Sequence, residues 1–582
     1  MAARQVSALS PRQWVERALS AERAGDGERA LAEMEGALAA YPRDAALAND
    51  AGSLAQRLGN HVLAETRFAL ALAFAPTNLD FAINRAIALT SLGNPREAAA
   101  FLRSFENAAG RTARYWSVRA NGERRAGLMA DAGRSYDRCL ALEPGHPRAL
   151  HGRARIAIER GEDDAIARFE RALAANPRDP DLWLGKAQAM EVAGDMEGAR
   201  DLVEQILAQA PAWLDGLRML AQINLAQGRA DFAEHYAYAA ARMPGDPAIP
   251  TAHANLLAVH DRFADAADVA REARYRFPDN PSLALLEASY TASAGDDDRA
   301  EALFAALHEN SAERWLQEAR HALRRKELSR AHDLLDRAER ETPWSVAAWA
   351  LRGLAWRLVG DERADWLYRP EAAIRAMELS AADDLIPRVV DALRGLHRRS
   401  ALPLGQSLRG GTQTRGRLFD RTEPIFAELR AAIERTIEQY RQALPPADAS
   451  HPLLRHRDTG FALAGSWSVR LTGGGDFHIA HIHPEGVISS ALYLVVPDDA
   501  SGPGQKGWLE LGRPPPHFRL DLPPLATIEP RPGRLALFPS YLFHGTTPFG
   551  SQERLTVAFD GVPREEDSRA KTDPLNGMRG KA

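Results

Sequence analysis

The sequence predicts a multidomain α + β chain, in which an α-superhelix of repeated helix pairs precedes a β-sandwich or small β-barrel. Three observations lead to this fold class. Glycine and proline recur with one period through the first two thirds of the chain. Within each period, apolar residues follow the spacing of two amphipathic helices. Beyond about residue 460, short apolar stretches alternate with proline- and glycine-containing turns, which is typical of all-β structure.

Glycine marks the repeat period. Successive glycines lie 33 or 34 residues apart at Gly25, Gly59, Gly93, Gly127, Gly161, Gly194 and Gly228, and the series continues at Gly295 and Gly360. Prolines keep the same period at Pro42, Pro76, Pro144, Pro177, Pro211, Pro244, Pro278 and Pro343. In each unit the glycine allows a turn between two helices, and the proline ends the second helix. Two units lack the glycine, and Arg262 and Glu327 stand near the expected positions.

The unit over residues 181–211 shows the helical pattern clearly. Ala199, Val203 and Ile206 fall at i, i+4 and i+7, which is one face of a helix. In period and residue classes the units resemble the tetratricopeptide repeat, and about ten or eleven hairpins are implied. We therefore assign residues 1–362 to a tetratricopeptide-repeat superhelix. Such a superhelix offers a concave groove for a protein or peptide segment, while a rigid spacer or self-association surface is the alternative.

Composition excludes several classes of protein. The single cysteine, Cys139, allows neither an intrachain disulfide nor a thiolate metal cluster. A formal net charge of −5 argues against a surface that binds nucleic acid or a membrane. The sequence has no apolar run long enough to cross a membrane, and its start reads as an amphipathic helix rather than an export signal. We expect a cytoplasmic protein.

After Gly360 the period ends. Residues 363–445 read as a helical lead-in, which includes a glycine- and threonine-rich stretch from Gln406 to Phe419. Residues 455–562 read as a β core, and residues 563–582 as a flexible tail. Six strands are expected, over residues 466–471, 478–484, 487–496, 507–512, 533–540 and 553–560.

Candidate chemistry is concentrated in this β core. His481 and His483 are two residues apart, so on a strand both imidazoles point from one face. His544 follows in a later segment, and Arg554 comes ten residues after it. Three imidazoles can bind a first-row transition metal and leave positions open for substrate or oxygen. A nearby guanidinium could hold an acidic co-substrate.

The runs HIHPEGVISSALYL (481–494), GRLALFPSYLFHGTTP (533–548) and ERLTVAF (553–559) resemble the 2-oxoglutarate/Fe(II)-dependent dioxygenases, in particular the prolyl-hydroxylase-like branch of bacteria and phages. The resemblance implies a double-stranded β-helix (jelly-roll) with flanking helices. It also implies hydroxylation of a substrate, coupled to decarboxylation of 2-oxoglutarate by O₂ at Fe(II). The substrate expected is a protein or peptide held by the repeats.

The resemblance also implies roles for individual residues. His481 and His544 match metal ligands of the family, and Arg554 matches the residue that pairs with the far carboxylate of 2-oxoglutarate. Tyr493 and Thr556 match residues that hydrogen-bond the same carboxylate. Three further residues are considered apart from the resemblance: His478 is either a residue that supports a ligand or a solvated loop residue, and Trp467 and Asp476 are candidates for the substrate side.

One position departs from the usual pattern of two histidines and a carboxylate. His483 stands where the carboxylate is expected, which gives three neutral ligands. The ligand pair could also be His483 and Glu485, which match the pattern HxE. We prefer His481 and His483, because Pro484 and Gly486 indicate that the strand is already turning at Glu485.

Two other functions are compatible with the sequence. One is a non-catalytic tetratricopeptide adaptor with a cupin-like docking module, and the other is a cupin-type enzyme that does not use 2-oxoglutarate. The carboxylate pocket expected from Arg554, Tyr493 and Thr556 distinguishes the dioxygenase from both alternatives, because neither of them requires such a pocket.

Overall fold

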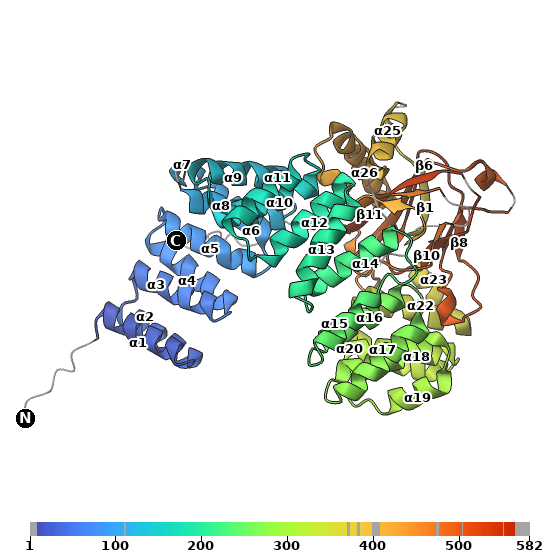
Figure 1. Cartoon of the computed structure of the whole chain (residues 1–582), viewed down its shortest axis with the longest axis horizontal. Coiled ribbons are helices and arrows are strands. Elements are labelled where there is room, and N and C mark those ends of the chain that lie inside the picture. The colour runs from blue at the N-terminus through green and yellow to red at the C-terminus, as the bar shows by residue number, and fades with distance from the viewer. Residues whose placement is uncertain are drawn as a thin grey trace, which may run out of the picture. The chain divides into compact units, whose positions relative to one another are not determined.

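The computed structural model describes residues 9–109, 112–368, 373–380, 384–398, 408–472, 476–502, 504–550 and 552–564. The chain divides into two compact units, residues 1–189 and 190–582, and each is described by itself (Figure 1). Most of the expected tail, residues 565–582, lies outside the described residues.

Helices alone form the described part of the first unit. In chain order they are α1 (Pro11–Arg23), α2 (Gly27–Ala40), α3 (Ala45–Arg57), α4 (His61–Phe74), α5 (Leu79–Ser91), α6 (Pro95–Arg103), the short α7 (Glu106–Ala109), α8 (Ala113–Arg125), α9 (Met129–Leu142), α10 (Pro147–Arg160), α11 (Ala165–Ala175) and α12 (Pro180–Ala193), the last of which runs into the second unit.

The second unit continues the series before its sheets begin. Its repeat helices are α13 (Met196–Gln209), α14 (Leu214–Ala226), α15 (Glu234–Arg242), α16 (Ala248–Val259), α17 (Phe263–Arg276), α18 (Pro281–Ala294), α19 (Asp297–Ala305), α20 (Ala312–Arg324), α21 (Leu328–Glu341), α22 (Val346–Val359) and α23 (Arg363–Tyr368). Apart from α7, the described helices up to α23 make eleven consecutive pairs along the chain, in agreement with the repeat period.

The periodic glycines and prolines occupy the turns that the sequence predicts. The nine glycines of the series have φ between 67° and 100°, a left-handed conformation that costs glycine little. Each proline is the second residue after a helix, as with Pro211 after α13. Where the glycine is missing, the left-handed residues are Asp261 and Lys326, one position before the expected Arg262 and Glu327. Asp261 keeps the period, since it lies 33 residues after Gly228, whereas Lys326 follows Gly295 by only 31 residues.

Small residues let the paired helices approach closely. An added Cβ on Gly185 in α12 would lie 2.2 Å from Cε1 of Phe169 in α11, whose ring is fully buried. We expect Gly185→Ala to destabilise the protein by about 1–3 kcal/mol, because the ring cannot move without disturbing the core. Urea unfolding followed by circular dichroism would measure this. Gly145→Ala is the control, since its exposed Cβ would meet no atom within 4 Å; equal midpoints for both variants would contradict the packing argument.

Helices and antiparallel strands follow the repeats. The helices are α25 (Leu385–His397) and α26 (Pro424–Ala443), and short 3-10 turns lie at Leu418–Asp420, Leu454–His456, Asp498–Ser501 and Pro516–Phe518. The strands are β1 (Arg375–Glu378), β2 (Leu408–Arg409), β3 (Thr412–Gln413), β4 (Phe461–Leu471), β5 (Phe477–His478), β6 (Ile488–Val495), β7 (Leu509–Leu511), β8 (Ala526–Ile528), β9 (Arg534–Pro539), β10 (His544–Thr546) and β11 (Arg554–Pro563).

The strands form the jelly-roll domain that the resemblance implied. A six-stranded sheet has the order β1-β9-β6-β11-β4-β3, a three-stranded sheet the order β10-β7-β8, and β2 pairs with β5. One hydrophobic core runs through this domain and into the last repeats: it contains Leu335 of α21, Leu351 of α22, Leu492 of β6, Leu511 of β7 and Leu555 of β11. The last repeats and the sheets are thus a single packed body.

Two expectations about secondary structure were wrong. The stretch over 478–484 is not a continuous strand: β5 ends at His478, and His481 makes only an isolated bridge to His544. Pro484 has no N–H to extend a ladder, and the Ile479 carbonyl accepts a hydrogen bond from the His481 ring. The lead-in is not purely helical either, because β1 pairs with β9 along the edge of the large sheet. Tertiary pairing there outweighs local helix propensity.

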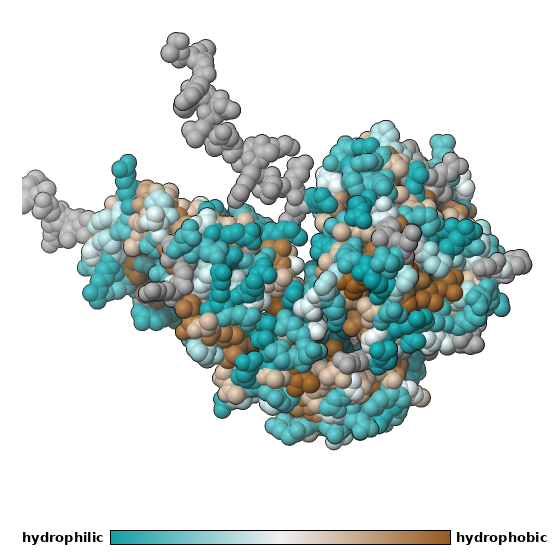
Figure 2. Space-filling model, turned by 90° about the horizontal axis from the view of Figure 1, so that it is seen from above, coloured by the Kyte–Doolittle hydropathy of each residue, from teal (hydrophilic) through white to brown (hydrophobic). Residues whose placement is uncertain are grey.

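Hydrophilic residues cover much of the face seen in Figure 2, and apolar residues gather there in smaller patches. Among the described residues, no helix combines the length and the apolar character needed to cross a bilayer.

Candidate metal centre

A backbone bridge brings two of the three candidate histidines together. The His481 N–H donates to the His544 carbonyl at 3.0 Å, and the His544 N–H donates back to the His481 carbonyl at 2.9 Å. The two imidazole centroids consequently lie 4.2 Å apart. His483 completes the group, with its centroid 5.0 Å from that of His481 and 4.8 Å from that of His544.

Each ring has its Nδ1 engaged by an oxygen. Nδ1 of His481 donates to the Ile479 carbonyl at 2.8 Å, and Nδ1 of His544 donates to the Leu542 carbonyl at 3.0 Å. Nδ1 of His483 contacts the Asp560 carboxylate. Because these oxygens can only accept, Nδ1 carries the proton in all three rings, and each Nε2 keeps its lone pair in the neutral form.

The three histidines are placed so that they could hold one metal ion. One ligand nitrogen from each lies within 4.8 Å of the others. Nε2 of His481 and Nε2 of His483 are only 3.0 Å apart, so two lone pairs face each other, and a cation between them would relieve the repulsion. Burial lowers the pKa of His481 and of His544 well below the usual value, and the neighbouring imidazoles add to the effect, which favours the unprotonated, ligating form.

Asp560 is a candidate functional residue that the sequence reasoning missed. It lies on β11 at the fourth position of the alternating series Arg554, Thr556, Ala558, Asp560, so the period of two in the strand could have revealed it. Metal-binding histidines commonly donate their second N–H to a carboxylate, which fixes the ring and strengthens the ligand. In HxD motifs the carboxylate would bind the metal directly. Here the Asp560 carboxylate instead contacts His483, which takes the ligand position.

Arg554 is a buried cation that forms no ion pair with a carboxylate in the part of the chain that the structure describes. Arg554 is only 3% exposed, and its Nε and Nη1 find no hydrogen-bond partner among the described residues. The guanidinium lies 5.5 Å from the ring centroid of Tyr493, whose buried hydroxyl makes no hydrogen bond of good geometry within the described residues. Burial lowers the pKa of Arg554, and the Tyr493 hydroxyl opposes that shift. A carboxylate would satisfy all of these groups.

Thr556 lies opposite Tyr493 in the pairing of β11 with β6 and lines the same cavity as Arg554. This cavity has a volume of about 860 Å³ and also contains the three histidines. Trp467 and His478 line it as well, whereas Asp476 is not among its lining residues and instead accepts a hydrogen bond from the Thr472 N–H.

Glu485, the alternative ligand, lines the cavity too but is exposed. It does not belong to the group of converging donor atoms that the described residues contain. The geometry therefore favours the register of His481 and His483.

Comparison with known proteins agrees with this architecture. Residues 465–560 match the family described as "Putative 2OG-Fe(II) oxygenase", and residues 162–223 match the tetratricopeptide-repeat family. Protein FlbA of Caulobacter vibrioides is 30% identical over 168 residues; this match covers 29% of the present chain and only 28% of FlbA.

Among solved structures, a tetratricopeptide repeat protein of Parabacteroides merdae is similar, with a TM-score of 0.35 and 20% identity over 42% of this chain and 97% of that one. The type IV pilus biogenesis factor PilW has a TM-score of 0.33 and 20% identity over 35% of this chain and 96% of its own. The two family matches confirm both resemblances seen in the sequence. The chain combines tetratricopeptide repeats with a C-terminal domain of the 2OG-Fe(II) oxygenase kind.

Proposed function

We propose that this protein is a 2-oxoglutarate- and Fe(II)-dependent dioxygenase that hydroxylates a protein or peptide substrate. The observation that carries the proposal is the combination, in one cavity, of three converging Nε2 lone pairs and the guanidinium of Arg554, which pairs with no carboxylate among the described residues. An adaptor with a docking module would need neither group. In this proposal residues 1–362 present the substrate and residues 363–562 carry the reaction.

His481, His483 and His544 would hold Fe(II) through Nε2, while their Nδ1 protons stay with the oxygens described above. Arg554 would bind the far carboxylate of 2-oxoglutarate, assisted by the hydroxyls of Tyr493 and Thr556. When bound, Fe(II) and 2-oxoglutarate supply the activation of O₂ by oxidative decarboxylation. The protein's own contribution is to position these groups in a pocket in which His544, Arg554 and Tyr493 are buried.

The direct test is conversion of 2-oxoglutarate to succinate by the purified chain under air. We expect succinate release that requires added Fe(II), proceeds slowly without substrate, and falls to background in His544→Ala. Equal rates in the wild-type protein and in His544→Ala would overturn the proposal, as would turnover that does not depend on Fe(II).

Asp560 provides a separate prediction, because it acts through His483 rather than on the metal. We expect Asp560→Ala to weaken Fe(II) binding about 10–100-fold, the usual effect of losing a carboxylate behind a histidine ligand. Asp560→Asn keeps an acceptor oxygen at the same place and should restore part of the affinity. Anaerobic metal titration measures both variants, and unchanged affinity in Asp560→Ala would show that the contact does not position the ring.

A further inference from the structure

Three repeat helices form one side of the cavity that contains the histidines. They are α16, α18 and α20, the first helices of three consecutive pairs, and all three lie in the second unit. Six of the polar residues that they contribute define what we name the repeat wall: Asn255, Tyr290, Ser293, Gln317, Arg320 and Arg324. Nothing in the proposed chemistry of iron or 2-oxoglutarate uses these residues.

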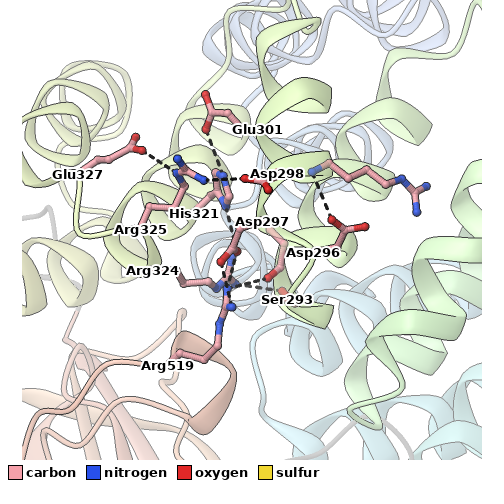
Figure 3. A network of polar contacts seen from close by, with 12 residues as sticks. Ser293, Asp296, Asp297, Asp298, Glu301, His321, Arg324, Arg325, Glu327 and Arg519 are labelled. Carbon is pink, nitrogen blue, oxygen red and sulfur yellow. Dashed lines mark hydrogen bonds and ion pairs between the residues drawn. The ribbon is translucent and has the colours of Figure 1, made fainter.

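The repeat wall is fixed to the jelly-roll domain around the cavity. Arg519 of the domain pairs with Asp297 of α19 at 2.6 Å, and Arg409 pairs with Asp261 at 2.6 Å. Nε of Arg324 donates to the His517 carbonyl at 3.1 Å. Figure 3 shows the part of this network that surrounds Arg324 and Arg519. These contacts therefore hold the repeat wall in place as one side of the cavity.

Two cations of the repeat wall form no ion pair with any residue that the structure describes. Arg320 and Arg324 lie one helical turn apart on α20, and within the described residues neither guanidinium makes an ion pair. Nη1 of Arg320 donates only to the Gln317 amide oxygen at 3.1 Å, and its buried Nε has no partner. Nη2 of Arg324 donates to the Ser293 hydroxyl at 3.0 Å, which is a neutral acceptor.

The acidic residues of the cavity do not neutralise this pair. Asp261 is held by Arg409, Asp560 contacts His483, and Glu485 is exposed. Burial lowers the pKa of Arg320, and the charge of Glu313 opposes this shift without forming an ion pair. Burial together with the charges of Arg320 and Arg519 lowers the pKa of Arg324 to about 9, and the opposing charge is that of Asp297, which is already paired with Arg519. Buried charges in proteins are normally paired, so this wall is suited to an anion that arrives with a ligand.

We propose that the repeat wall recognises a polypeptide substrate by an acidic group, a carboxylate or a phosphate, which binds Arg320 and Arg324 while a neighbouring part of the segment reaches the histidines. A polypeptide fits because consecutive repeats present their side chains along a groove, as repeat proteins do for extended segments. The claim that the bound segment is a substrate rests on the proposed function. The claim that the repeat wall binds an acidic segment does not depend on it.

The test is fluorescence anisotropy of labelled short peptide pools, each randomised around a central Asp, phosphoserine, Asn or Ser, with the purified full-length chain and no added iron or 2-oxoglutarate. We expect at least one acidic pool to bind about tenfold more tightly than its neutral counterpart, the value of one charge-assisted contact. The better of the Asp and phosphoserine pools identifies the anion. Equal affinity of the acidic and neutral pools for the wild-type chain would overturn the proposal.

Variants locate the effect. Arg320→Gln should abolish the preference for acidic pools, and Arg320→Lys should keep part of it. Arg325→Gln is the matched control: Arg325 is next to Arg324 on the same helix but points to Glu327, at 2.6 Å (Figure 3). An unchanged preference in a folded Arg320→Gln protein contradicts the assignment.

A competition experiment separates this site from the co-substrate pocket. With Zn(II) present, saturating 2-oxoglutarate should leave binding of the acidic pool intact, and Arg320→Gln should leave 2-oxoglutarate binding intact. Displacement of the peptide by 2-oxoglutarate would mean that Arg320 belongs to the co-substrate site, and our proposal would fail. Because the peptide assay needs no turnover, it can succeed even if the dioxygenase proposal fails.

Discussion

We expect His544→Ala to lower the affinity for Fe(II) more than about a hundredfold. Removing a residue that only hydrogen-bonds a metal ligand already lowers metal affinity about 10–100-fold. Only two of the three converging nitrogens would remain, and these two rings would keep the repulsion between their Nε2 atoms, 3.0 Å apart. Anaerobic titration with Fe(II) against a colorimetric chelator measures the affinity.

The control for this experiment is His308→Ala, which removes an exposed histidine in the connection between α19 and α20. It should bind Fe(II) as the wild-type protein does. Similar affinity in His544→Ala and His308→Ala would mean that the histidine cluster is not the metal site.

Arg554→Gln should weaken binding of 2-oxoglutarate about ten- to hundredfold and leave metal affinity nearly unchanged. The substitution removes a buried charge-assisted contact, which is worth about 1.5–3 kcal/mol. Glutamine fills much of the same space as arginine. The loss of 2-oxoglutarate affinity should therefore come from the missing charge and paired N–H donors of the guanidinium, and not from an empty cavity. Equilibrium dialysis of 2-oxoglutarate with the Zn(II)-loaded protein provides the measurement.

Arg531→Gln is the matched control, because Arg531 is an exposed arginine that pairs with Glu529 at 2.6 Å. Wild-type affinity for 2-oxoglutarate in a folded Arg554→Gln protein would remove the main support for a dioxygenase over a cupin-type enzyme.

The repeat architecture could be predicted well because its signals are local. A left-handed turn needs glycine, and a proline cannot continue a helix, so both leave a periodic mark in the sequence. At Asp261 and Lys326, next to the positions noted in the sequence, residues other than glycine take the left-handed conformation, so the turn is present without its glycine. Strand β1 was missed for a different reason, because only its pairing with β9 makes it a strand.

The candidate site was predicted in part. The motif residues His481, His483, His544 and Arg554 could be picked out, and the structure brings the histidines together even though the segment between His478 and Pro484 is not a strand. A backbone bridge, rather than strand periodicity, places His481 beside His544. Arg320 and the rest of the repeat wall could not be found from sequence, because they meet the histidines only through the packing of the repeats on the jelly-roll domain.

The central claim is that these three histidines and Arg554 form one site for Fe(II) and 2-oxoglutarate. A crystal structure of the protein grown anaerobically with both, with anomalous scattering at the iron edge, tests it most directly. We predict one iron, with Nε2 of His481, His483 and His544 at about 2.0–2.3 Å, and a 2-oxoglutarate whose far carboxylate meets Arg554. An iron bound by Glu485 in place of His483 would contradict the ligand assignment, and dispersed histidines without iron would contradict the account as a whole.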